Sequence, residues 1–397
     1  MINLAVKEIS HSWVRYVLTA AGLGLLIGVT LTMTGLVRGM MDDAVALIRG
    51  THADLWVVQD DTMGPYAESS TLYDDVSRNI AGLPGVAEAS NVAYLTVQVR
   101  HSNKDVRAQV AGFELGKPGE PPYLIAGRPI AKARYEAIAD SKTGFRIGDK
   151  IGIRRTELTV VGLTSGMVSS GGDPVVFVTM QDAQDIQFQK DNTTIYNERN
   201  RLSANPKLNR PGSPGLLQAV TESQQSNHKV NAVLVRLTPG FDPDTVAETI
   251  RRWKHFEVYT YEQMQQILQQ RVIINALRQL GMFMVILAIV STAIIALIIY
   301  NMTMGKIREI AVLKLIGAKN RTIVAMILQQ AWGLGIIGFF VGKATAATLA
   351  PLFPKRVELL AFDSVVAFFI ILLICLLASL VAIRAALKVQ PAAAIGG

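Results

Sequence analysis

The sequence has few of the residues from which metal and redox sites are built. It contains one cysteine and five histidines in 397 residues. The cysteine, Cys375, lies in an apolar run, so the chain forms no internal disulfide and this thiol is expected to be inert. The histidines have neither the HExxH spacing nor a CxxC partner. We therefore predict no metal site in this chain.

Nucleotide-binding and nucleophile motifs are also missing. The segment most similar to a phosphate-binding loop, GIIGFFVGKAT, has Ile337 where the first glycine is required and Ala344 where a serine or threonine is required. The segment GLTSG at 162–166 does not match the GxSxG pattern of a nucleophile elbow. We predict no catalytic residue and no cofactor bound by this chain, which excludes an ATPase and argues against an enzyme.

Acidic residues are fewer than basic ones. The 31 Asp and Glu residues stand against 39 Lys and Arg, which gives a net charge of +8. Half of the chain is hydrophobic and the mean hydropathy is +0.31. A basic excess can indicate nucleic-acid binding, but much of it lies at the ends of apolar runs, where it orients a protein in a bilayer. The composition therefore predicts a membrane protein with a large polar part and no nucleic-acid partner.

Four apolar runs are near the length of about 20 residues that a bilayer requires. A short basic segment separates the second run from the third, and Arg384 and Lys388 follow the fourth. Because basic loops stay on the cytoplasmic side, both termini are predicted to be cytoplasmic and the protein to lie in the inner (plasma) membrane. The predicted spans cover 14–36, 280–300, 323–350 and 365–383.

The chain between the first two spans is too long for a loop. It contains short strand-like runs such as ADLWVVQ, NAVLVRLT and KIGIRRTELTVVGLT (150–164), alternating with helical patterns. The predicted fold is an α-helical membrane protein with four transmembrane helices and a large extracytoplasmic α+β domain between the first and second spans. Its further parts are an interfacial helix at 1–13, stalk helices at 37–50 and 261–279, the domain at 51–260 with a flexible insertion at 189–229, a cytoplasmic segment at 301–322, an external loop at 351–364 and a cytoplasmic tail at 384–397.

Two of the apolar runs carry glycines at a spacing that allows close helix packing. Gly24 and Gly28 form a GxxxG step in the first predicted span. Gly338 and Gly342 repeat the spacing in the third. Small residues at this spacing let two helix backbones approach each other in a membrane. We expect each pair to mark a packed helix face.

The basic segment 301–322 has the pattern of a short amphipathic helix. The pattern predicts a helix lying along the membrane face, and Gly317 suits the turn near its end. The residues that follow helical spacing are Ile307, Ile310, Ala311, Lys314, Leu315 and Ala318. A helix held between two spans could act as a lever for a soluble partner. The alternative is a basic loop that only sets the topology.

The segment REIAVLKLIGAKNRTIV resembles the REIGxLRAxGA signature of FtsX-like and MacB-like permeases of ABC transporters, and the tail AIRAALKVQPAAAI resembles their closing motif. The order of spans and domain agrees as well, and ADLWVVQ resembles the DevC-type branch. The resemblance implies a permease whose ATP and Mg²⁺ are bound by a separate ATPase subunit. The residues that it assigns to ATPase coupling are Lys306, Arg308, Glu309, Lys314, Gly317 and Ala318.

The same resemblance implies the partners and the function. The partners would be an ABC ATPase subunit, a second copy of this permease, a periplasmic adaptor, an outer-membrane channel and membrane lipid. The function would be export of a lipid, glycolipid or other hydrophobic cargo. Two alternatives remain open: an FtsX-like regulator that activates a periplasmic cell-wall hydrolase without transport, and a machine that extracts lipoproteins or lipids from the inner membrane.

Overall fold

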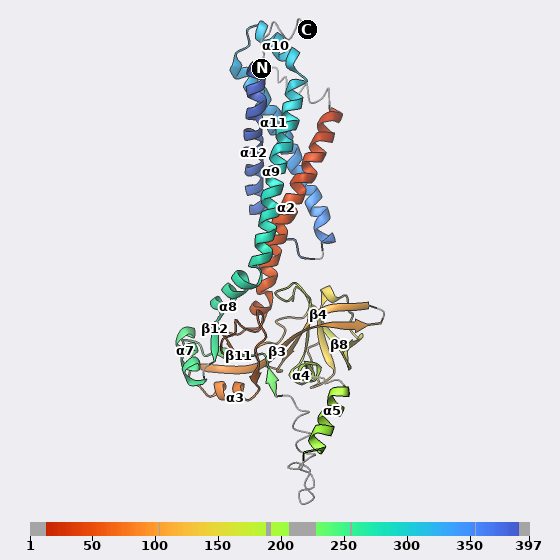
Figure 1. The fold of residues 1–397 in the computed structure, drawn as a ribbon, viewed down its shortest axis with the longest axis vertical. Helices are drawn as coiled ribbons and strands as arrows, with labels where there is room; N and C mark the ends of the chain where they lie inside the picture. The colour runs from red at the N-terminus through yellow and green to blue at the C-terminus, as the bar shows by residue number, and fades with distance from the viewer. Residues whose placement is uncertain are drawn as a thin grey trace, which may run out of the picture. The chain divides into compact units, whose positions relative to one another are not determined.

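The computed structural model describes residues 13–102, 104–187, 192–205, 228–254, 256–353 and 355–388. The chain divides into a helical unit, Met1–Met40 with Asn275–Gly397, and an external unit, Met41–Ile274 (Figure 1). The predicted interfacial helix before Trp13 and the predicted tail after Lys388 lie outside the described residues.

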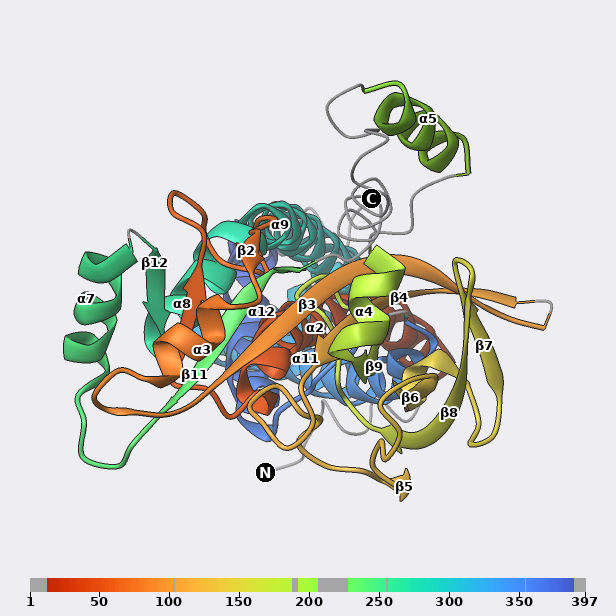
Figure 2. The same ribbon diagram turned by 90° about the horizontal axis from the view of Figure 1, so that it is seen from below.

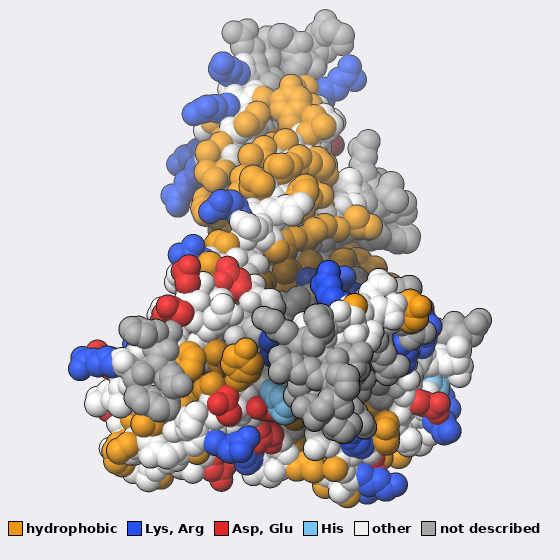
Figure 3. All heavy atoms as spheres, turned by 60° about the horizontal axis from the view of Figure 1, so that its bottom comes forward, with side chains coloured by type: hydrophobic (Ala, Val, Ile, Leu, Met, Phe, Trp, Pro, Cys, Tyr) orange, Lys and Arg blue, Asp and Glu red, His pale blue; other side chains and the backbone are white. Residues whose placement is uncertain are grey.

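Four long helices make up most of the helical unit, and each is long and apolar enough to cross a membrane. This confirms the predicted four spans and the position of the α+β domain between the first and the second. Figure 3 shows hydrophobic side chains over much of the visible face of this unit. The helices are α2 (Trp13–Gly50), α9 (Ile274–Met304), α11 (Asn320–Leu349) and α12 (Ala361–Lys388).

The two predicted stalks differ from each other. Helix α2 runs without a break to Gly50, through the first predicted stalk. The second stalk is not one helix that runs into the next span: α8 (Tyr261–Ile267) passes into a π-helical turn, η2 (Leu268–Val272), before α9 begins. In this wider turn the Ile273 amide donates to the Leu268 carbonyl at 3.2 Å, and both side chains are buried. Burying both side chains accounts for the break, which the apolar spacing alone does not predict.

The first lobe of the external unit is a four-stranded antiparallel sheet in the order β12–β1–β11–β3. In chain order its elements follow a βαββαβ pattern, which is the ferredoxin-like arrangement. Both faces of strand β1 are buried, which explains its uninterrupted apolar sequence LWVV. The elements are β1 (Leu55–Val58), α3 (Val76–Ala81), β3 (Val86–His101), β11 (Ala232–Leu237), α7 (Pro243–Lys254) and β12 (Glu257–Thr260).

The second lobe is inserted between β3 and β11 and closes into a barrel. Strand β3 pairs with β4, then the ring continues through β9, β6, β8 and β7 and returns to β3. Closure removes the open sheet edges among these six strands. The added elements are β4 (Lys104–Phe113), β6 (Glu136–Asp140), β7 (Lys150–Ile153), β8 (Thr156–Thr164), β9 (Val175–Thr179) and α4 (Met180–Gln187).

Short elements complete the external unit. Strand β5 pairs with β8 outside the ring, and β2 pairs with β10 in a small separate sheet. Helix α5 lies within the predicted flexible insertion, so part of that stretch is helical, while 206–227 lies outside the described residues. The elements are β2 (Leu72–Tyr73), β5 (Ala126–Gly127), η1 (Ser141–Thr143), α5 (Asn192–Ser203) and β10 (Lys229–Val230).

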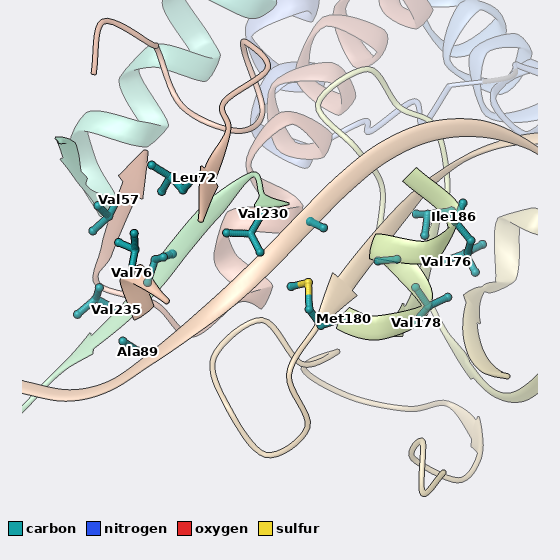
Figure 4. Close-up of a cluster of buried hydrophobic side chains, with 14 of the residues drawn as sticks. Val57, Leu72, Val76, Ala89, Val176, Val178, Met180, Ile186, Val230 and Val235 are labelled. Carbon is teal, nitrogen blue, oxygen red and sulfur yellow. The ribbon is translucent and has the colours of Figure 1, made fainter. Parts of the chain in front are cut away.

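One long strand joins the two lobes. The 16 residues of β3 pair with β11 at one end and with β4 and β7 at the other. Figure 2 shows the strand passing from one lobe to the other. Figure 4 shows buried side chains on both sides of it, with Val57, Val76 and Val235 in one group and Val176 and Val178 in the other. A single apolar cluster therefore extends through both lobes.

An ion pair between the buried carboxylate of Glu136 and the exposed side chain of Arg128 holds the loop before β6. Both guanidinium Nη atoms of Arg128 donate to the Glu136 carboxylate, at 2.7 and 3.0 Å. The backbone amides of Ala131 and Lys132 also donate to it, at 3.0 and 3.1 Å. These contacts, the Arg128 bonds first, lower the pKa of Glu136 from 4.5 to about 2. The carboxylate therefore fixes a chain segment that has no secondary structure of its own.

The low pKa makes this ion pair a source of pH-dependent stability. Because the folded pKa lies below the ordinary value, its contribution is complete above about pH 4.5 and is lost as the pH falls toward 2. We expect Glu136→Gln to lower the unfolding free energy by about 1.5–3 kcal/mol at pH 7. The difference from the parent chain should shrink at pH 3, as measured by thermal unfolding. A difference independent of pH would contradict this role for the charge.

Candidate functional site

The basic segment between the second and third spans folds around a short helix, α10 (Ile307–Leu315). Ile310 and Ala311 are completely buried and hold the helix against the other helices of the unit. Its end is a Schellman motif, in which the Ala318 amide donates to the Leu313 carbonyl and the Gly317 amide to the Lys314 carbonyl. Gly317 has φ of 93°, a conformation that explains the glycine. The segment is therefore an ordered helix with a defined end.

Lys314 points into the helical unit. Its Nζ donates to the carbonyls of Leu387 at 2.9 Å and Ala386 at 3.3 Å, in the last turn of α12. A cation at this place binds carbonyls that have no partner within the helix and interacts favourably with the helix dipole. Lys314 thus ties α10 to the end of the fourth span.

The opposite side of α10 is exposed and partly apolar. Val312 is 45% exposed, Leu315 61% and Ile316 79%. Arg308 lies one turn before Val312 and is also exposed. We call Arg308, Val312, Leu315 and Ile316 the α10 ridge. Exposed apolar side chains between basic residues are typical of a protein contact surface.

The other predicted coupling residues surround this ridge. Glu309 and Gly317 are exposed, whereas Ala318 is half-buried. Lys306 precedes the helix and is half-buried, and this burial lowers its pKa although Glu309 opposes the effect. The helical spacing groups Leu315 with Ile310 and Ala311, but Leu315 is exposed whereas those two side chains are buried.

The two predicted glycine pairs meet each other. A Cβ atom built on Gly342 would lie 2.7 Å from the Gly24 carbonyl oxygen and 3.0 Å from the Gly28 nitrogen. One built on Gly28 would lie 3.0 Å from the Gly342 carbonyl oxygen, and Gly338 lies against Leu23. Real Cβ atoms do not approach backbone atoms to 2.7 Å. The backbones of α2 and α11 therefore approach each other closely because glycine occupies these positions.

A third glycine pair was missed by the sequence reasoning. Gly35 and Gly39 continue the spacing along α2, and the chain between α11 and α12 lies on them. The Glu358 amide donates to the Gly35 carbonyl at 3.0 Å, and the Arg356 carbonyl covers Gly39. The available signal was GLVRG, a GxxxG step like the two that were noticed. The predicted external loop at 351–364 is therefore partly an extended strap across α2, with a short helix, η3 (Ala350–Leu352), at its start.

No group of three His, Cys, Asp or Glu residues within the described ranges is placed to hold a metal ion. Cys375 is buried against Gly335 of α11, where a Cβ atom would lie 2.8 Å from its sulfur. This thiol fills a close contact between α11 and α12.

Two family profiles match the chain. The profile of the MacB-like periplasmic core domain matches residues 16–253. The profile of the FtsX-like permease C-terminal region matches residues 281–391. The second match contains α10 and the third and fourth candidate spans.

Several proteins are similar over their full length. An uncharacterized ABC transporter permease of Mycobacterium tuberculosis (strain ATCC 25618 / H37Rv) is 25% identical over 397 residues, which is 100% of both chains. A protein of Staphylococcus haemolyticus (strain JCSC1435), provisionally named hemin transport system permease protein HrtB, is 23% identical and covers 100% of this chain and 99% of its own.

Among solved structures, the periplasmic region of MacB from Actinobacillus actinomycetemcomitans matches with 9% identity and a TM-score of 0.35, over 56% of this chain and 96% of that one. The family profiles are the stronger finding, since together they match residues 16–253 and 281–391. The chain belongs to the ABC transporter permeases of the FtsX-like family with a MacB-like periplasmic core domain.

Proposed function

We propose that this permease couples ATP hydrolysis by a separate ATPase subunit to movement of its external domain, and that this movement drives export of a lipid, glycolipid or other hydrophobic cargo. As an ABC transporter permease it works with an ATPase partner. The observation that carries the proposal is the α10 ridge, an exposed apolar surface on an ordered helix between two candidate spans. The ridge is the surface that we assign to the ATPase.

The anchoring of α10 supports its use as a lever. The helix is connected to α9 and α11 by short turns, and Lys314 ties it to the end of α12. A push on the ridge would therefore be transmitted to three spans. Helix α9 follows directly on the π-helical turn η2, so its displacement would reach the external domain through the chain itself.

The orientation and further partners follow from the same proposal. With the basic segment inside, both termini lie in the cytoplasm of a cell whose inner membrane holds the protein. Helix α9 exposes an apolar face that includes Phe283, Ile289 and Leu297, which suits a second copy of the chain or membrane lipid. A periplasmic adaptor and an outer-membrane channel would complete an export path. The HrtB relative, named for hemin, is consistent with a hydrophobic cargo.

We expect simultaneous replacement of Arg308 and Glu309 by alanine to uncouple ATP hydrolysis from transport. Both side chains are exposed, so the fold should be kept. Arg308 belongs to the ridge and Glu309 is its neighbour in the chain, which places both where we propose that force is transmitted. The measurement is ATPase activity and cargo release by the reconstituted complex of permease and ATPase. Hydrolysis should continue while release falls at least tenfold.

The matched control is Lys319→Ala, an exposed basic residue beyond Gly317 and outside the ridge. It should leave both activities unchanged. Full transport by the Arg308 and Glu309 double variant would overturn the coupling role. Copurification of a cell-wall hydrolase in place of an adaptor would favour the regulatory alternative.

A further inference from the structure

Helix α11 has an exposed stripe along one side. It consists of four exposed residues at steps of four, four and three, a spacing that places them on one face of the helix. The backbone of α2 covers Gly342 on a different face, so the described helices leave this face open. The four residues, which we call the α11 stripe, are Trp332, Ile336, Phe340 and Lys343.

Lys343 is an exposed cation that forms no ion pair with the described residues. The described part of the helical unit contains three acids, and two of them follow α11 in the chain, near the same end of the unit as Lys343. Arg38 binds the first of these, Asp363, at 2.7 Å. Arg356 lies 3.5 Å from the second, Glu358. The third acid is on α10, beyond the opposite end of α11. Each nearby carboxylate is therefore already paired with an arginine.

The stripe is charged at one end and apolar along the rest of its length. Helix α11 ends at Leu349, six residues after Lys343. Trp332 precedes Lys343 by eleven residues, which is about 16 Å along the helix axis. A lysine near the end of a span extends its ammonium group to the headgroup level, while apolar residues deeper in the span face the acyl chains. The stripe therefore has the same order of polarity as a phospholipid.

We propose that the α11 stripe binds an anionic phospholipid. Its phosphate would lie at Lys343, and one acyl chain would follow the three apolar residues of the stripe. A lysine ammonium is a compact charge suited to phosphate, and a basic residue near the membrane surface attracts anionic lipid. In the orientation proposed above, this lipid belongs to the outer leaflet. The proposal depends neither on the ATPase contact nor on the identity of the cargo.

A lipid fits this face better than a second copy of the chain does. Two copies in one membrane would bring their Lys343 side chains to the same depth. The acids near that end are both paired, so no carboxylate would separate the two like charges. An anionic headgroup supplies the missing charge without this repulsion.

The test uses the full chain in bilayers of equal parts phosphatidylglycerol and phosphatidylcholine. Bromine atoms near the ends of the acyl chains are placed on one lipid or the other, so that the composition stays constant. Bromine quenches the fluorescence of a tryptophan that it contacts. Because the chain has four tryptophans, the signal of Trp332 is taken as the difference between the parent chain and Trp332→Phe. We expect phosphatidylglycerol to be enriched at Trp332 by about fivefold over phosphatidylcholine.

Three variants assign this preference to one charge. Lys343→Gln removes the charge from an exposed side chain, so the two lipids should then quench Trp332 equally. Lys343→Arg keeps the charge and should keep the preference. The matched control is Lys319→Gln, an exposed lysine that caps the other end of the same helix. This control should keep the preference, and it tests whether lipid reaches Trp332 from the opposite leaflet.

Elution of each variant from a size-exclusion column like the parent chain shows that the fold is kept. Equal quenching by the two lipids in the parent chain would overturn the proposal, as would an unchanged preference in Lys343→Gln. Quenching by neither lipid would also overturn it, since another protein chain would then cover the stripe. The same holds if Lys319→Gln loses the preference as fully as Lys343→Gln, because binding would then follow the total charge.

Discussion

In a chain carrying Ile316→Asp, we expect binding of the ATPase subunit to weaken by about a hundredfold. Ile316 is 79% exposed on the α10 ridge, so the change leaves the core of the helical unit untouched. If the ATPase buries this side chain, the variant loses its apolar contact and also has to desolvate a carboxylate. Together these effects are on the order of 3 kcal/mol. The measurement is a binding titration of purified ATPase against the permease in nanodiscs.

The control for Ile316→Asp is Leu352→Asp. Leu352 is 77% exposed and ends the short helix η3. The two variants therefore make a similar chemical change at similarly exposed positions, but Leu352 is far from α10 in the sequence. It should bind the ATPase with the parental affinity. Equal binding by the two variants would show that the ridge is not the ATPase surface. Both variants should insert into the membrane and elute from a size-exclusion column like the parent chain. This behaviour would show that each variant keeps its fold.

The four spans could be predicted because each apolar run is long enough to cross a bilayer, which few other structures require. The ends were less predictable: α11 begins at Asn320 and α12 at Ala361, before the apolar runs themselves begin. The break at η2 was missed because the apolar spacing of Met264, Leu268 and Val272 is also that of a regular helix. A π-helical turn adds one residue to a turn and has no distinct sequence pattern.

In the external domain, short strands could be recognised but not their partners. The stretch 150–164 was predicted as one strand, whereas it is a hairpin that turns at Arg154, a residue with φ of 55°. Glycine or asparagine would have marked such a turn, and arginine does not. Barrel closure depends on pairing between β3 and β7, which are about fifty residues apart. Local patterns carry no information about such pairings.

The candidate site illustrates the same limit. The charges and Gly317 located α10, but the inner and outer faces could be assigned only with α12 in place, because Lys314 faces inward to bind its last carbonyls. The GxxxG steps identified two helix faces without showing that they meet. Their spacing did not distinguish contact with a helix, as at Gly24, from contact with an extended strap, as at Gly35.

The contact between α2 and α11 leads to the second large expected effect, that of Gly342→Leu. The first atom of the new side chain would lie 2.7 Å from the Gly24 carbonyl oxygen and 2.8 Å from Ile27. The Gly24 oxygen is a backbone atom and cannot rotate away, so the two helices must separate. We expect a loss of about 3 kcal/mol, and a midpoint of thermal unfolding lower by roughly 10 °C, in detergent or nanodiscs.

Helix α11 offers a matched control in Gly333→Leu. A Cβ atom at Gly333 meets nothing within 4 Å, so the same substitution is accommodated there and leucine's higher helix propensity should leave stability equal or slightly greater. A general intolerance of larger side chains in α11 would lower both midpoints alike. If the two variants unfold at the same temperature, the close approach of α2 and α11 does not depend on Gly342. A deficit confined to Gly342→Leu would assign the glycine pairs to holding the first span against the third, next to the chain that carries the α10 ridge.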